Sequence, residues 1–160
     1  MQKGLLTSSM LTKLKYVGTS QADLLIIYKL FIRCLTEYCS VVWHSSLTES
    51  QKDDIERIQR VCLRVILDDD YVDYSTARGI CQLESLESRR ELKCLNYGLM
   101  AIRHPKHKTM FPMKQPNKYY SLRKEDPFIV NSSRTNYYAV SSVPYVQRKL
   151  NQHFKENGKI

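Results

Sequence analysis

Residues 23–43 read DLLIIYKLFIRCLTEYCSVVW, and this stretch decides the fold. Its apolar side chains recur at intervals of three and four residues, which is the period of one face of an α-helix. Gly18-Thr19-Ser20 interrupts the pattern just before it, and Ser20 offers a hydroxyl that can cap a helix. We therefore predict an amphipathic helix over residues 20–43. Its predicted core face consists of Leu24, Ile27, Tyr28, Phe31, Leu35 and Tyr38, and Trp43 is also expected in the core.

Helical patterns continue on both sides of this stretch. A short helix is predicted around residues 6–15. Thr48 and Gln51 have the spacing of a capping box, so a second long helix should begin there and run to about residue 66. A short helix over 75–80 and a long helix from Ser85 to about residue 104 complete the pattern. The predicted fold class is mainly α, a small bundle of three to five helices over residues 1–104.

Charge separates this helical part from the rest of the chain. The net charge is +9, but residues 1–104 carry 14 basic and 13 acidic side chains, whereas residues 105–160 carry 11 and 3. All five prolines lie in the second part, which we predict to be an irregular, basic, tyrosine-containing C-terminal extension. Such asymmetry is typical of an arm that contacts a polyanion, and a merely solvated tail is the alternative.

The cysteines and the charges within the apolar stretch indicate the cellular compartment of the protein. Five cysteines, an odd number without any C-x-x-C, favour buried, reduced thiols. Lys29, Arg33 and Glu37 interrupt the apolar residues 24–43, so we expect no membrane span. Together these features indicate an intracellular protein, cytoplasmic or nuclear.

Four motifs then occur in a characteristic order. Glu37-Tyr38 with Val42-Trp43 is followed by an I-E-R-I-Q-R motif within residues 54–66, by Y-x-x-A at 74–77 and by L-x-x-L-x-x-R-R at 83–90. This succession resembles the region after the palm in reverse transcriptases of non-LTR retrotransposons, which are LINE-type and here jockey-like. The similarity covers residues 10–110, and an asparagine like Asn151 extends it to about residue 155.

The resemblance implies the thumb and post-thumb region of an RNA-directed DNA polymerase. The catalytic aspartates of that family hold two magnesium ions in the palm, and the palm motifs are missing from this sequence. We therefore expect no enzymatic activity from this chain alone and no cofactor of its own. Asp68-Asp69-Asp70 is interpreted as a solvated acidic loop, and His104 and His107 with Cys94 lack the spacing of a zinc site, so no metal site is predicted.

A polymerase thumb grips its template and primer through phosphates, and basic side chains make such contacts without reading sequence. The expected partners are RNA or an RNA–DNA duplex and the missing palm domain, with no membrane; the oligomeric state stays open. The alternatives are a small helical protein-interaction module, or a decayed transposon relic with no selected function. Some of the basic stripe could instead form helix ion pairs, Asp53 with Arg57 and Glu56 with Arg60. The candidate nucleic-acid-binding residues are Arg57, Arg60, Arg64, Arg89 and Arg90 in the body and Lys114, Lys118, Arg123, Lys124, Arg134, Arg148 and Lys149 in the tail, where Tyr119, Tyr120, Tyr137, Tyr138 and Tyr145 alternate with them.

Overall fold

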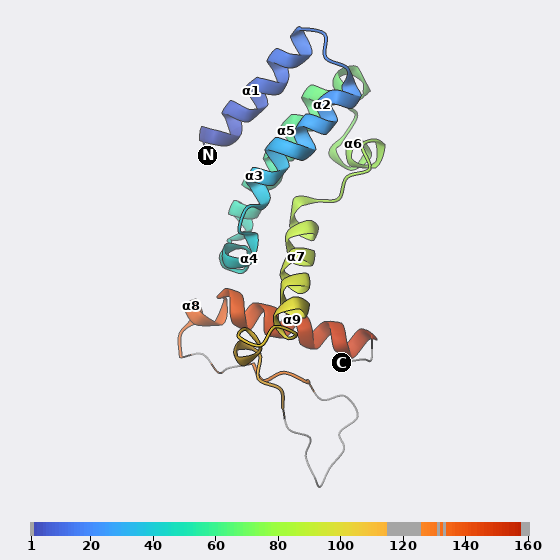
Figure 1. The fold of residues 1–160 in the computed structure, drawn as a ribbon. Coiled ribbons are helices and arrows are strands. Elements are labelled where there is room, and N and C mark those ends of the chain that lie inside the picture. The colour runs from blue at the N-terminus through green and yellow to red at the C-terminus, as the bar shows by residue number, and fades with distance from the viewer. Residues whose placement is uncertain (1, 115–125, 131, 133, 158–160) are drawn as a thin grey trace. The chain divides into compact units, whose positions relative to one another are not determined.

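A computed structural model describes residues 2–114, 126–130, 132 and 134–157, and the protein is mainly helical, as predicted (Figure 1). The chain forms two compact units. The first unit comprises Met1–Tyr38 and Leu47–Arg89, and the second comprises Cys39–Ser46 and Arg90–Ile160. This division falls at Arg89 rather than at the predicted boundary after residue 104, because the later turns of α7 contribute their buried residues to the core of the second unit.

The first unit is built from helices throughout. It contains α1 (Gln2–Tyr16), α2 (Gln21–Ile27), a π-helical turn (Tyr28–Ile32), α3 (Arg33–Glu37), α5 (Glu49–Leu67), a 3₁₀ turn (Asp68–Asp70), α6 (Tyr74–Ile80) and the start of α7 (Leu86–Ala101). Three helix starts match the sequence prediction. Ser20 accepts from the Asp23 amide, Ser85 accepts from the Ser88 amide, and Thr48 exchanges both capping-box hydrogen bonds with Gln51.

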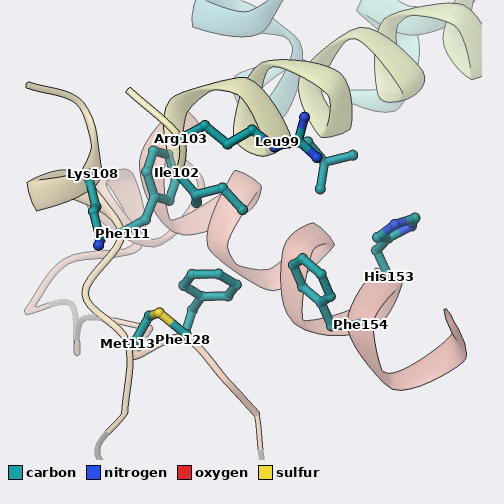
Figure 2. Close-up of a pocket in the computed structure, with 9 residues that line it drawn as sticks. All are labelled: Leu99, Ile102, Arg103, Lys108, Phe111, Met113, Phe128, His153 and Phe154. Carbon is teal, nitrogen blue, oxygen red and sulfur yellow. The ribbon is translucent and has the colours of Figure 1, made fainter. Parts of the chain in front are cut away.

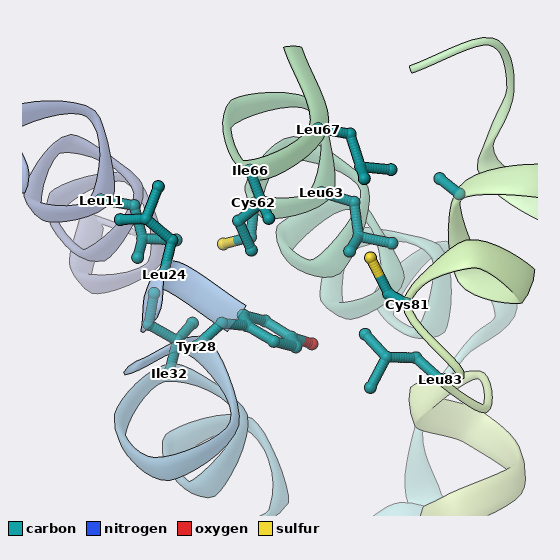
Figure 3. Close-up of a cluster of buried hydrophobic side chains, with 11 residues drawn as sticks. Leu11, Leu24, Tyr28, Ile32, Cys62, Leu63, Ile66, Leu67, Cys81 and Leu83 are labelled. Atoms are coloured by element: carbon teal, nitrogen blue, oxygen red, sulfur yellow. The ribbon is translucent and has the colours of Figure 1, made fainter. Parts of the chain in front are cut away.

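Side chains from α1, α2, the π-helical turn, α5 and α6 share one apolar core in this unit (Figure 3). The α5 helix supplies the largest share, because its apolar residues recur on one face from Ile55 to Leu67. The buried members are Leu11, Leu24, Tyr28, Ile32, Cys62, Leu63, Ile66, Leu67, Ala77, Cys81 and Leu83.

The predicted single helix over residues 20–43 is wrong in its second half. A π-helical turn adds a residue to the turn and shifts the helical phase. Tyr28 and Ile32 are buried as a result, whereas Phe31, Leu35 and Tyr38 are 61%, 65% and 75% exposed. The helix then ends, because Cys39 adopts a left-handed conformation with φ of 50°. The predicted core face is therefore correct up to Tyr28 and lies in solvent beyond it.

The cysteines divide into buried and exposed ones. Cys62, Cys81 and Cys94 are buried, as predicted, but Cys34 and Cys39 are exposed. Burial raises the pKa of Cys62 to about 12 and that of Cys94 to about 11. The buried thiols are consequently held in the protonated form.

A chain of hydrogen bonds runs through the first unit beside its apolar core. Tyr28 Oη donates to Oε1 of Gln59 at 2.6 Å, and Nε2 of Gln59 donates to Tyr74 Oη at 3.0 Å. Tyr74 in turn donates to the carboxylate of Glu56, which also accepts from the backbone amide of Leu86 at 3.1 Å. Because Leu86 is the first residue of α7, the Glu56 carboxylate caps the N-terminus of that helix.

The second unit contains α4 (Ser40–Trp43), a 3₁₀ turn (His44–Ser46), the rest of α7, a 3₁₀ turn (Lys108–Met110), α8 (Asn136–Ala139) and α9 (Ser142–Asn157). The prediction of irregular chain beyond residue 105 is wrong for α9. Pro144 lies in the first turn of that helix, where an amide donor is not needed. The buried apolar residues of the unit are Cys94, Ala101, Phe111, Phe128, Val146 and Leu150.

Gly98 of α7 and two buried side-chain amides, those of Gln147 and Asn151, explain how α9 packs. At Gly98 of α7 an added Cβ would lie only 2.7 Å from Cγ1 of Val146, so the glycine permits the close approach of the two helices. Asn151 accepts from the Phe128 amide at 2.8 Å and donates to the Phe128 carbonyl at 3.0 Å. Gln147 donates to the Met110 carbonyl at 2.9 Å. These side chains hold non-helical backbone against the helix.

Candidate nucleic-acid interface

Arginines gather on the surface formed by α5 and α6 of the first unit. Arg57, Arg60 and Arg64 follow one face of α5, and Arg78 extends from α6. Arg57 and Arg64 are exposed, while Arg60 and Arg78 are half-buried. We call these four residues the arginine row. The sequence prediction included the three residues of α5 and missed Arg78, whose place beside them depends on how α6 packs.

Tyrosine rings orient three members of this row. The Cζ atoms of Arg60 and Arg78 lie 5.2 Å and 5.1 Å from the centroid of the Tyr74 ring, and that of Arg64 lies 5.3 Å from the centroid of Tyr71. At such distances the ring face attracts the cation. Tyr74 is itself fixed by its hydrogen bonds to Glu56 and Gln59. The guanidinium groups are therefore held in place before any ligand binds.

The charge of the arginine row is not neutralised by neighbouring carboxylates. Within the described ranges, none of its four members has a carboxylate oxygen within 4.0 Å, and the helix pairs of Asp53 with Arg57 and Glu56 with Arg60 do not form. Glu56 faces Tyr74 and Leu86 instead. Two lysines of this unit are paired instead, Lys15 with Asp68 at 2.7 Å and Lys52 with both Glu49 and Glu87.

Arg89 and Arg90, which the sequence grouped with this row, have other partners. Arg89 Nε donates to Oε1 of Glu37 at 2.6 Å, and this hydrogen bond raises the pKa of the guanidinium. Arg90 is fully buried, with Nε 3.4 Å from Nδ1 of His44 and its Cζ 5.8 Å from the centroid of the Trp43 ring. The prediction of a phosphate contact is wrong for Arg90, because a buried guanidinium does not reach a nucleic-acid backbone.

The cationic residues predicted in the tail differ in their surroundings. Lys114 and Arg134 are exposed, and Arg148 donates to the carbonyl of Ala139 at 2.9 Å. Lys149 pairs with Glu91 at 3.1 Å. Lys118, Arg123 and Lys124 lie outside the described residues, as do Tyr119 and Tyr120.

A second surface of the first unit is apolar. Five large side chains of α2, the π-helical turn and the segment through α3 are exposed by 52% to 75%, and we call them the exposed apolar face: Ile26, Leu30, Phe31, Leu35 and Tyr38. Several large apolar side chains exposed on one short helical segment are typical of a site that contacts another molecule.

The acidic loop shows no sign of a metal site. Asp68–Asp70 forms a 3₁₀ turn, and Asp68 pairs with Lys15. In the part of the chain that the structure describes, no three His, Cys, Asp or Glu side chains converge as metal ligands. In those same ranges, no helix combines the length and apolarity that a bilayer crossing needs.

Comparison of the chain with models of known protein families, with curated proteins and with solved structures finds no match in any of the three. The resemblance to reverse transcriptases therefore depends on the order and spacing of the sequence motifs.

Proposed function

We propose that this chain is a thumb and post-thumb fragment of the RNA-directed DNA polymerase of a non-LTR retrotransposon. It lacks the catalytic palm and binds RNA or an RNA–DNA duplex through the phosphate backbone. The observation that carries the proposal is the arginine row, an unneutralised set of guanidinium groups oriented by tyrosine rings. A surface of this kind suits a polyanion, because guanidinium groups bind phosphate oxygens in a fixed geometry.

The proposed binding is electrostatic and independent of sequence. From Arg57 to Arg64 the row covers two turns of α5, roughly 10 Å along the helix axis. Phosphates of one strand can therefore contact several guanidinium groups at once. Each contact releases condensed counterions, so the affinity should fall steeply as salt rises.

A titration at two salt concentrations tests the proposal. A fluorescently labelled RNA–DNA duplex should bind at low salt and dissociate at higher salt, and the triple variant Arg57→Gln, Arg60→Gln, Arg64→Gln should lower the salt slope by about two to three units. Single substitutions give a matched comparison: Arg64→Gln should weaken binding more than Lys13→Gln, an exposed lysine of α1 outside the row. Salt-independent affinity, or equal effects of these two substitutions, would contradict the proposal.

A protein-interaction module is the second candidate, and the exposed apolar face favours it. Within the proposed family the natural occupant of that face is the palm domain that this chain lacks. Leu35→Lys should then abolish co-purification with a palm domain of the same retrotransposon class, whereas Leu92→Lys, at an α7 side chain that is 50% exposed, should not. Binding of a protein without any binding of nucleic acid would favour this candidate over the first.

A further inference from the structure

A cavity of about 490 Å³ lies within the second unit (Figure 2). Its volume is in the range of small-molecule sites. Most of its lining is apolar, and in Figure 2 the ring of Phe128 lies between those of Phe111 and Phe154. The remaining lining residues are Leu99, Ile102 and Met113 together with the basic side chains Arg103, Lys108 and His153.

The walls of this cavity are held by specific contacts. Asn151 binds both backbone groups of Phe128, and Met113 forms an antiparallel bridge with Phe128. The bridge segment adds a bond from the Lys114 amide to the Pro127 carbonyl at 2.8 Å. Backbone fixed in this way needs little reordering when a ligand enters, which lowers the entropic cost of binding.

The basic side chains add a charge preference to an apolar site. Arg103 and Lys108 are both exposed, and in the residues that the structure describes neither has a carboxylate within 4.0 Å. Asp126, an acidic residue two positions before Phe128, is paired with Lys155 at 2.7 Å. Long basic side chains place their alkyl stems along apolar surface and their charges in water. The cavity is thus apolar inside and cationic at its edge.

We infer that this cavity binds an amphipathic anion, a molecule with an aliphatic body and a single carboxylate or phosphate head. The aliphatic body contacts the three phenylalanine rings, and the head lies at the solvent-facing edge beside Arg103 or Lys108, whose charged ends lie apart in Figure 2. A nucleotide base fits less well. Its polar edge would lose water on entry, and among the described residues of the lining there is no amide or hydroxyl side chain to replace that water. The inference is independent of the proposed nucleic-acid binding, which concerns the first unit.

This inference can be tested by calorimetric titration of the whole chain with ligands that share one alkyl chain and differ in their head group. Dodecanoate and dodecyl phosphate, below their micelle concentrations, should each bind saturably at one site. Dodecanol, which has the same body without the charge, should bind roughly tenfold more weakly. Comparison of the two anions shows whether a carboxylate or a phosphate is preferred, and either preference supports the inference. Adenosine monophosphate should show no saturable binding.

Variants locate the site. The double variant Arg103→Gln, Lys108→Gln should weaken dodecanoate binding about tenfold and leave dodecanol binding unchanged. Lys106→Gln, an exposed lysine outside the cavity lining, should change neither. Thermal melting confirms that these surface variants fold. The inference is overturned by any of three results: no saturable dodecanoate binding, equal affinity for dodecanoate and dodecanol, or equal effects of the double variant and Lys106→Gln. Tighter binding of adenosine monophosphate than of dodecanoate, if the double variant weakens it, would assign the cavity to nucleotides instead.

Discussion

Arg89 and Glu37, more than fifty residues apart in the chain, form a hydrogen-bonded ion pair with Nε and Oε1 separated by 2.6 Å. The Glu37 side chain is buried, and Arg33 approaches the same oxygen at 4.0 Å. Two of the motifs that produced the family resemblance therefore meet within the first unit. A buried carboxylate requires a cationic partner, so Glu37 and Arg89 both have a role in the stability of the first unit.

Removal of Arg89 should destabilise the first unit strongly. The variant Arg89→Leu removes the partner that lies 2.6 Å from the buried Glu37 carboxylate, and we expect a loss of about 3 kcal/mol in the free energy of unfolding. Urea denaturation measures it. Arg57→Leu, which removes an exposed arginine, serves as the control and should change stability by at most about 0.5 kcal/mol. Similar losses of unfolding free energy in the two variants would mean that the ion pair does not stabilise the first unit.

Tyr28 should make the protein sensitive to alkali. Burial raises the pKa of its hydroxyl well above the ordinary value of 10.0, so its contribution is complete below pH 10 and is lost as the pH rises further. In Tyr28→Phe the slope of stability against pH above pH 10 should decrease by about 1.4 kcal/mol per pH unit.

At neutral pH the same Tyr28→Phe variant should be less stable by roughly 1–3 kcal/mol, because Oε1 of Gln59 loses its donor. Denaturant titrations at a series of pH values test both effects. Tyr16→Phe, at a side chain that is 94% exposed, should leave neutral-pH stability unchanged. An unaltered alkaline slope in Tyr28→Phe would contradict this prediction.

Gly98→Ala should destabilise the second unit by roughly 1–3 kcal/mol, because the new methyl group would overlap Val146 and Leu150. Gly79→Ala in α6 provides the opposite case. Nothing lies within 4 Å of a Cβ at that position, so the higher helix propensity of alanine should stabilise by about 0.5–1 kcal/mol. Thermal melting distinguishes the two. The additional substitution Val146→Ala should recover part of the loss in Gly98→Ala, and a Gly98→Ala variant as stable as the parent would show that the two helices separate easily.

Alkylation should divide the cysteines into two groups. Iodoacetamide at pH 8 should modify the exposed Cys34 and Cys39, while Cys62, Cys81 and Cys94 react only after denaturant is added. Burial hides the three thiols and raises their pKa, so the reactive thiolate is scarce. Peptide mass spectrometry gives the order of modification. Reaction of Cys62 at the rate of Cys34 in the native protein would be inconsistent with the structure.

Local sequence signals predicted much of the helical pattern. Ser20, Thr48 and Ser85 cap helices as expected, because capping depends on residues within one turn of each other. The π-helical turn at Tyr28–Ile32 was not predictable from a constant helical period. The α9 helix was hidden by Pro144, which breaks a helix in its interior but not in its first turn.

The candidate sites were less predictable, since they depend on contacts between distant residues. Arg60 and Arg64 could be placed on one helix face from their spacing, but the rings of Tyr71 and Tyr74 reach them only through the fold. Arg90 has the same side chain as the other arginines predicted to bind nucleic acid, and it differs from them only in being buried. The cavity of the second unit joins residues from 99 to 154, a combination that no local pattern indicates.

The interleaved order of the two units has a consequence for synthesis on the ribosome. All residues of the first unit have been made once Arg89 is added, so that unit can fold while the rest of the chain is still growing. Cys39–Ser46 belongs to the second unit and cannot pack until later residues have been made. The ring nitrogen Nε2 of His44 contacts the hydroxyl of Tyr145, which follows 101 residues later in the sequence. Contacts of such long range form slowly. A nascent chain therefore carries this short segment without its contact to Tyr145 until α9 has been made.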